Sequence, residues 1–120
     1  MNKQGFTLLE LLAVIAVVAL LAAGLVPNLL QARKTAHSQA TRGFMREVIT
    51  GIETRRELAT NTLPDASTTC AELAGKPLPY SVRRCKYEPD SAGGYTVTAE
   101  SISGQVFQFD GANTRTVPSF

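Results

Sequence analysis

One carboxylate, Glu10, interrupts a run of apolar residues near the start of the chain. A charged side chain costs about 3 kcal/mol at the centre of a membrane-spanning helix, so an acid in such a run usually has a function and a partner. Glu10 follows a short polar start that contains Lys3 and a Gly5-Phe6 junction. A simple membrane anchor has no use for this acid. A helix that docks against copies of itself does, because a cation one helical turn away would neutralise it.

The other residues that could do chemistry are scattered or incomplete. His37 is the single histidine, and its neighbour Ser38 would point elsewhere on a helix. Cys70, Cys85 and a distant histidine do not make the four ligands of a zinc site. The segment Asp110-Gly111-Ala112-Asn113 lacks the run of oxygen ligands of a calcium loop and predicts a plain turn. The sequence therefore predicts no enzyme, no cofactor and no metal.

A small basic cluster leaves nucleic acid as an open hypothesis. Arg83, Arg84 and Lys86 lie close to Tyr80 and Tyr87; phosphates attract basic groups, and aromatic rings stack on bases. If this segment is a strand, alternation places Arg84 and Lys86 on one face and Arg83 on the other. The net charge of the chain is only +2, which favours no particular partner.

The apolar run predicts a membrane span. Phe6 to Val26 is 21 residues, and a helix needs about 20 to cross the hydrocarbon core. Two alternatives remain open: a secretory signal cut near Ala22-Ala23-Gly24, and a permanent anchor. Glu10 argues against both. Pro27 lacks a backbone donor and is expected to bend the helix just beyond the span.

The rest of the chain predicts a helix and a sheet. Helical spacing continues to about Ala59, so we expect one helix from Phe6 to Ala59 whose second half packs on a sheet. The apolar residues that we expect to form a stripe facing the sheet repeat every four residues: Ala36, Ala40, Phe44, Val48 and Ile52. Turn residues and strand alternation then predict a three- or four-stranded antiparallel sheet, with strands over 80–87, near 95–100, near 106–109 and over 114–117. A short helical turn is expected at 71–73.

The residues Lys3-Gln4-Gly5-Phe6-Thr7-Leu8-Leu9-Glu10, followed by the apolar run to Val26 and by Pro27, resemble the leader and helix start of type IV pilins. That family includes type II secretion pseudopilins and competence pilins. The resemblance covers Met1 to about Lys34. It implies the type IV pilin fold, an α+β fold in which a long N-terminal helix, half of it transmembrane, packs on a small antiparallel sheet.

The resemblance also implies roles for single residues. A prepilin peptidase would cut between Gly5 and Phe6 and would N-methylate Phe6. Glu10 would guide assembly by pairing with the amine of Phe6, and Pro27 would kink the helix. Because the leader implies export, Cys70 and Cys85 are expected to form a disulfide; the alternative is two unpaired thiols.

The expected organisation is a leader at 1–5, an assembly half of the helix at 6–26, an amphipathic half at 27–59, and a loop and sheet at 60–120. The expected function is a structural subunit, major or minor, of a bacterial type IV pilus. It would be single-pass in the cytoplasmic membrane with its N-terminus inside, and then enter a surface pilus. Arg33 and Lys34, after the span, do not favour that orientation.

The expected partners are like subunits and other pilins, prepilin peptidase, a membrane platform and a separate assembly ATPase. The alternatives are a type II secretion pseudopilin, a DNA-binding competence pilin and an ordinary secreted domain. Which surface process such a pilus would serve, whether motility, adhesion or DNA uptake, is left open by the sequence.

Overall fold

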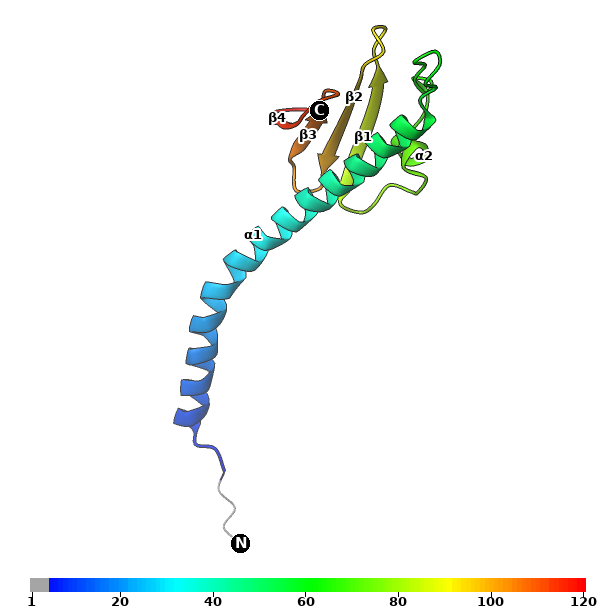
Figure 1. Cartoon of the computed structure of the whole chain (residues 1–120). Coiled ribbons are helices and arrows are strands. Elements are labelled where there is room, and N and C mark those ends of the chain that lie inside the picture. Colours follow the sequence, from blue (N-terminus) through cyan, green and yellow to red (C-terminus); the bar gives the residue numbers. More distant parts are fainter. Residues whose placement is uncertain (1–4) are drawn as a thin grey trace. The chain divides into compact units, whose positions relative to one another are not determined.

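The computed structural model describes residues 5–120, so Met1–Gln4 of the predicted leader lie outside the described residues. A long helix, α1 (Leu8–Arg55), is followed by a short helix, α2 (Cys70–Ala74), and by four strands (Figure 1). The strands are β1 (Val82–Pro89), β2 (Tyr95–Ser101), β3 (Val106–Phe109) and β4 (Thr114–Val117). They pair antiparallel in the order β1-β2-β3-β4. The predicted α+β class and four-stranded sheet are confirmed.

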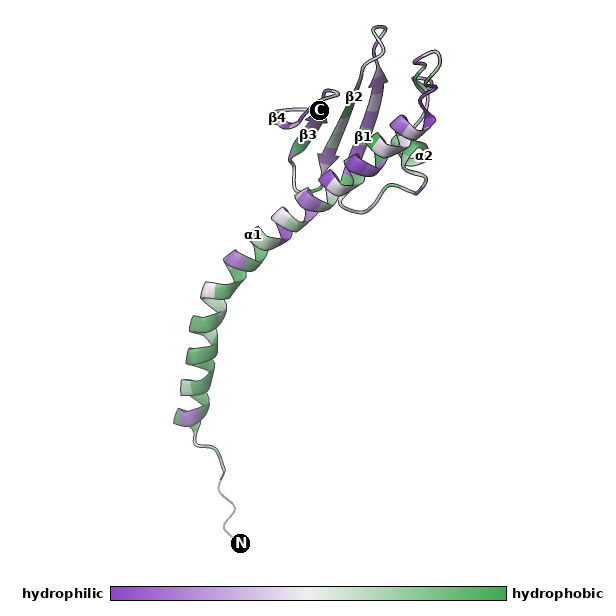
Figure 2. Cartoon of the chain, viewed as in Figure 1, coloured by the Kyte–Doolittle hydropathy of each residue, from purple (hydrophilic) through white to green (hydrophobic). Residues whose placement is uncertain are grey.

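The chain divides into two compact units, of which the first ends at Arg33. This unit contains the first part of α1, where apolar residues cover all sides of the helix (Figure 2). The helix continues without a break through Pro27. By length and composition alone, α1 is the one helix in the described part of the chain that could cross a membrane.

The second unit, Lys34–Phe120, is here called the head. In it α1 becomes amphipathic, and the buried residues of the helix are Ser38, Thr41, Phe44, Met45, Val48 and Ile52. The expected residues Ala36 and Ala40 are instead exposed, so that part of the predicted stripe is wrong. A repeat of four residues advances about 40° per step on a helix of 3.6 residues per turn. The rotation that accumulates over the sixteen residues from Ala36 to Ile52 is too large for every residue of the repeat to face one sheet.

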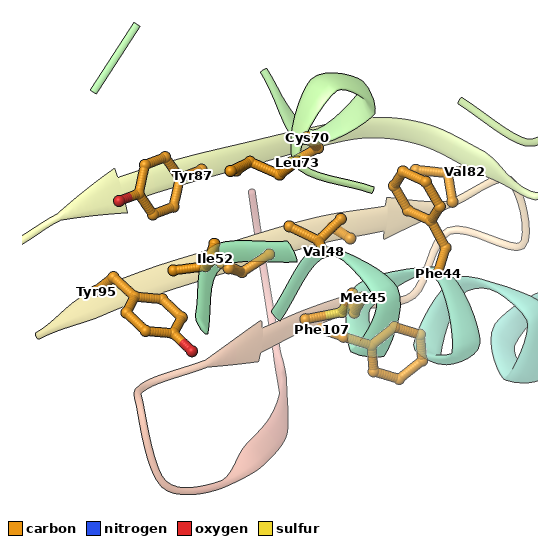
Figure 3. Close-up of a cluster of buried hydrophobic side chains, with 12 residues drawn as sticks. Phe44, Met45, Val48, Ile52, Cys70, Leu73, Val82, Tyr87, Tyr95 and Phe107 are labelled. Atoms are coloured by element: carbon orange, nitrogen blue, oxygen red, sulfur yellow. The ribbon is translucent and has the colours of Figure 1, made fainter. Parts of the chain in front are cut away.

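The inner face of the sheet completes the core (Figure 3). Val97 pairs with Phe109, and Ala99 pairs with Phe107, across β2 and β3. Val97, Ala99 and Phe107 belong to one buried cluster with Val48 and Ile52 of α1, and the partly buried Phe109 packs against it. Two tyrosines at the cluster's edge satisfy their hydroxyls: Tyr87 donates to the carbonyl of Pro64 at 3.0 Å, and Tyr95 donates to Glu53 at 2.8 Å. Burial raises the pKa of both phenols.

Helix α2 joins α1 to the sheet. Cys70 at its start forms the disulfide with Cys85 of β1, as expected. The ammonium of Lys76 pairs with Glu47 of α1. Gly51 of α1 faces the carbonyl of Leu73, and a Cβ added at Gly51 would overlap that carbonyl. The short helix can therefore lie close to α1 only because residue 51 has no side chain.

Several predicted boundaries differ from the structure. The helix begins at Leu8 rather than Phe6, and the first strand ends at Pro89 rather than Tyr87. The helix ends at Arg55 rather than near Ala59, because a tight turn follows in which the N–H of Glu57 donates to the carbonyl of Thr62 at 3.0 Å. The first strand begins at Val82 rather than Tyr80. There the N–H of Val82 donates to the carbonyl of Pro79, which makes 79–82 a turn.

Candidate functional site

The residues singled out at the start of the chain lie at the N-terminus of α1. Gly5, Phe6 and Thr7 precede the helix and are not helical, and Phe6 is 89% exposed. Oε2 of Glu10 accepts hydrogen bonds from the N–H of Thr7 at 2.9 Å and from its hydroxyl at 3.1 Å. In return the N–H of Glu10 donates to the hydroxyl of Thr7 at 3.2 Å. These reciprocal bonds form a capping box, which satisfies donors that the first turn otherwise leaves free.

Sequence reasoning missed the role of Thr7. The signal was present, because Thr7-Leu8-Leu9-Glu10 has the Thr-x-x-Glu spacing of a capping box. The same device recurs at the start of α2, where Glu72 accepts from the N–H and hydroxyl of Thr69 at 2.8 and 2.9 Å. In α2 the hydrogen bonds from Thr69 lower the pKa of Glu72. Thr7 thus fixes where α1 begins and which way the carboxylate of Glu10 points.

The apolar part of the helix that follows the cap is exposed along its length in the described residues. Its large apolar side chains are at least half exposed, from Leu8 at 76% to Leu30 at 55%. Apolar surface of this extent marks an interface with lipid or with other protein. Glu10 is the only charged side chain between Thr7 and Gln31. The first unit therefore combines a bare apolar surface with one carboxylate at its amino end.

The basic cluster is arranged differently from the prediction. The pairing of β1 with β2 is irregular between Val82 and Arg84, so Arg83 is an extra residue in the strand. As a result Arg83 and Arg84 both reach Glu100, at 3.1 and 2.5 Å. The prediction that Arg83 faces away from Arg84 is wrong, because a bulge breaks the strict alternation of a strand.

The charges of this cluster are mostly compensated within the chain. Glu100 is 7% exposed and accepts from both arginines. The hydrogen bond from Arg84, together with the charges of both arginines, holds the pKa of Glu100 below its usual value. Lys86 pairs with Glu88 at 2.7 Å. A phosphate would have to compete with these carboxylates, so the arrangement gives no support to the nucleic-acid hypothesis.

The other residues considered as candidates are Asp110 and His37, and each has contacts within the head. Oδ1 of Asp110 accepts from the N–H groups of Ala112 and Asn113, at 3.2 and 2.9 Å, as in a turn. Within residues 5–120, no group of three or more His, Cys, Asp or Glu side chains is placed to hold a metal ion. The ring of His37 packs edge-on against the exposed ring of Tyr80, with 6.2 Å between centroids.

Comparisons with known proteins cover both units. Residues 37–117 match the family model described as pilin A4, and residues 1–26 match the model of the prokaryotic N-terminal methylation motif. A 48-residue stretch is 50% identical to the type IV wide pilus major component PilA4 of Thermus thermophilus. That stretch is 40% of this chain and spans only 37% of the length of the relative.

A solved structure resembles this chain over part of its length. The TTHA1221 type IV pilin protein from Thermus thermophilus superposes with a TM-score of 0.58 at 27% sequence identity. The match covers 67% of this chain and 97% of that one. Pilins are structural subunits that polymerise after processing by prepilin peptidase, and they have no catalytic role. With the fold, the methylation motif and a family model that matches about two thirds of its residues, this chain belongs to the pilin A4 family of type IV pilins.

Proposed function

We propose that this chain is a prepilin whose mature form begins at Phe6 and serves as the major subunit of a type IV pilus. The observation that carries the proposal is the junction at the start of α1. Gly5 and Phe6 lie exposed outside the helix, as a peptidase requires of a bond it cleaves. Glu10 lies one turn further on, with its carboxylate directed toward the amino end.

Assembly would follow from this geometry. Cleavage after Gly5 would give Phe6 a free amine, and N-methylation would keep its positive charge. That amine, from the same chain or from a neighbour, would pair with Glu10 in the low dielectric of a helix bundle. Wrong axial registers would leave the carboxylate unpaired, which is costly away from water. Glu10 would therefore set the stagger between subunits.

The apolar surface of the first unit would serve two environments in turn. Before assembly Phe6–Val26 would span the cytoplasmic membrane with its N-terminus inside, and in the pilus it would pack against like helices. Small residues permit backbones to approach closely in such bundles; here they are Ala13, Ala16, Ala19, Ala22, Ala23 and Gly24. A membrane platform and a separate ATPase would supply the machinery and the energy. Both named relatives are pilins, which favours a pilus over a secretion pseudopilus.

Substitution of Gly5 tests the proposal. A Gly5→Val chain should accumulate in the membrane at its full length, and surface filaments should disappear. Gly24→Ala is the matched control, because a Cβ at Gly24 meets nothing within 4 Å and the residue is far from the junction. Normal processing of the Gly5→Val chain would refute cleavage at this site.

A further inference from the structure

The charged side chains of the head fall into two groups, those compensated within the chain and those that are not. Six ion pairs join the compensated ones: Glu53–Arg56, Glu47–Lys76, Arg83–Glu100, Arg84–Glu100, Lys86–Glu88 and Arg115–Asp110. Arg55 also lies by Glu72, to whose carbonyl it donates at 2.6 Å. In the described head this leaves acids and bases without a partner of opposite charge: Glu57, Asp65, Asp90, Lys34, Arg42 and Arg46.

The three uncompensated acids gather beyond the carboxyl end of α1. Asp65 and Asp90 line the same open hollow of about 470 Å³, formed by loop residues 60–66 and the β1–β2 turn. Glu57 belongs to the same loop, since it bridges to Thr62. All three acids are exposed. The acids therefore line or flank one concave surface.

The hollow is held in shape by contacts on both sides. The hydroxyl of Tyr87 donates to the carbonyl of Pro64, which ties the loop to β1. The amide of Asn61 packs on Gly93 of the β1–β2 turn, where an added Cβ would collide with it. Arg56, the residue that follows α1, donates to Asn61 at 2.8 Å and so ties the loop to the end of the helix. A partner would meet a surface that is already ordered, which lowers the entropic cost of binding.

The three uncompensated bases lie on α1, before its last two turns. Arg42 and Arg46 are exposed and four residues apart, so their side chains lie on one face of the helix. The guanidinium of Arg42 lies 4.6 Å from the centre of the Phe107 ring, a contact that leaves its charge available. Arg46 and Arg55 are separated by nine residues, or about 14 Å of helix, and the acids lie beyond Arg55.

We propose that these two surfaces dock on each other between copies of this chain, the acidic hollow of one head receiving Arg42 and Arg46 of the next. The proposal rests on the proposed function, to which it adds a contact between heads. Opposite charges on two separate surfaces of one subunit suit a head-to-tail interface, which repeats without closing. A contact between the same surface of two copies, acidic on acidic or basic on basic, would bring like charges together.

Charge reversal and its repair test the interface in the full chain in cells. Arg42→Glu/Arg46→Glu should lower the yield of sheared filaments about tenfold at low salt. Adding Glu57→Lys/Asp90→Lys to the same chain should restore the yield. The control, Lys86→Glu/Arg115→Glu, makes the same change in net charge at residues that already have partners, and it should leave the yield unchanged. Rising salt should narrow the difference in yield between wild type and the reversal variant, since salt screens exposed charges.

Two further measurements distinguish a failure of this inference from a failure of the proposed function. Protease resistance of the head and an oxidised Cys70–Cys85 pair, measured in the membrane fraction, show whether each variant folds. The peptide that begins with N-methylated Phe6, measured in the same fraction, reports processing. A folded, processed reversal variant with wild-type filament yield, or one that the compensating changes fail to rescue, would overturn the interface alone. Absence of the Phe6 peptide from wild type would instead refute the proposed function.

Discussion

Glu10 and Thr7 are bound to each other by three hydrogen bonds of 2.9–3.2 Å, which close the first turn of α1. The carboxylate that would pair with a neighbouring subunit is thus also the group that defines the start of the helix. These two roles are separable, because an amide oxygen accepts hydrogen bonds as a carboxylate does but carries no charge.

Substitutions of Glu10 should therefore distinguish charge from capping. Glu10→Gln keeps an acceptor for Thr7, whereas Glu10→Ala removes both charge and acceptor, with a cost of about 1 kcal/mol to the helix end. We expect both variants to insert in the membrane and both to lose most surface filaments, since the charge is what assembly uses. Filament yields from sheared cells check this. If Glu10→Gln assembled normally and only Glu10→Ala failed, capping alone would explain the residue.

Gly51 should be intolerant of any side chain. A Cβ there would overlap the carbonyl of Leu73, so Gly51→Ala must push α2 away from α1 and should destabilise the head by about 1–3 kcal/mol. Gly43→Ala is the matched control in the same helix, because a Cβ there meets nothing within 4 Å. It should stabilise the head by up to about 1 kcal/mol. Urea unfolding of the detergent-solubilised chain measures both; equal effects would show that α2 does not lie against Gly51.

Loss of the disulfide should weaken the head without changing its fold. The Cys70–Cys85 link closes a loop with a sequence separation of 15 residues. Its removal in Cys70→Ser/Cys85→Ser should cost about 3 kcal/mol on the loop-entropy model. The free energy of unfolding of the wild-type chain, from urea titration, should fall by a similar amount in reductant, and the double variant should not respond. A reductant effect on the double variant would mean that something other than this disulfide is being reduced.

The stability of the head should depend on pH through Glu100. Hydrogen bonding from Arg84 and the charges of both arginines lower the pKa of Glu100 below 4.5 in the folded state. Stability from this group is therefore complete above about pH 4.5, and it is lost as pH falls through the lowered folded-state pKa. Other carboxylates, such as Asp65 and Asp110, contribute in the same direction.

Glu100→Gln should isolate the contribution of that residue. The variant should be less stable than wild type at pH 7, and the difference should shrink as the pH falls below 4.5 and Glu100 takes up a proton. Glu88→Gln, in an ion pair that is about half exposed on both sides, should change little at any pH. Urea midpoints between pH 3 and pH 7 give the comparison. A constant difference between Glu100→Gln and wild type across that range would contradict the ion pairs seen here.

Much of the fold followed from local pattern. The apolar run before Val26, the alternation near 95–100 and the turn residues after Phe109 each predict their element from neighbours in sequence. The buried helix residues Phe44, Val48 and Ile52 were also predictable, because they lie close enough together for a four-residue repeat to stay on one face. The same repeat failed at Ala36, where the accumulated rotation had carried it away from the sheet.

What could not be predicted depends on long-range contact or on irregular backbone. The need for glycine at residue 51 arises from α2, which approaches from 22 residues further along the chain. The joint approach of Arg83 and Arg84 to Glu100 arises from a strand bulge that alternation does not reveal. The cap formed by Thr7 is different, since its spacing was visible in the sequence and was overlooked.

The most direct test of the account is peptide mass spectrometry of filaments sheared from the cell surface. The account predicts an abundant peptide that begins with N-methylated Phe6, which would establish cleavage after Gly5, methylation and incorporation into filaments together. A chain that instead begins near Leu25 would contradict the account and would identify an ordinary secreted domain. The same Phe6 peptide found in the membrane fraction but absent from filaments would contradict the role of major pilus subunit.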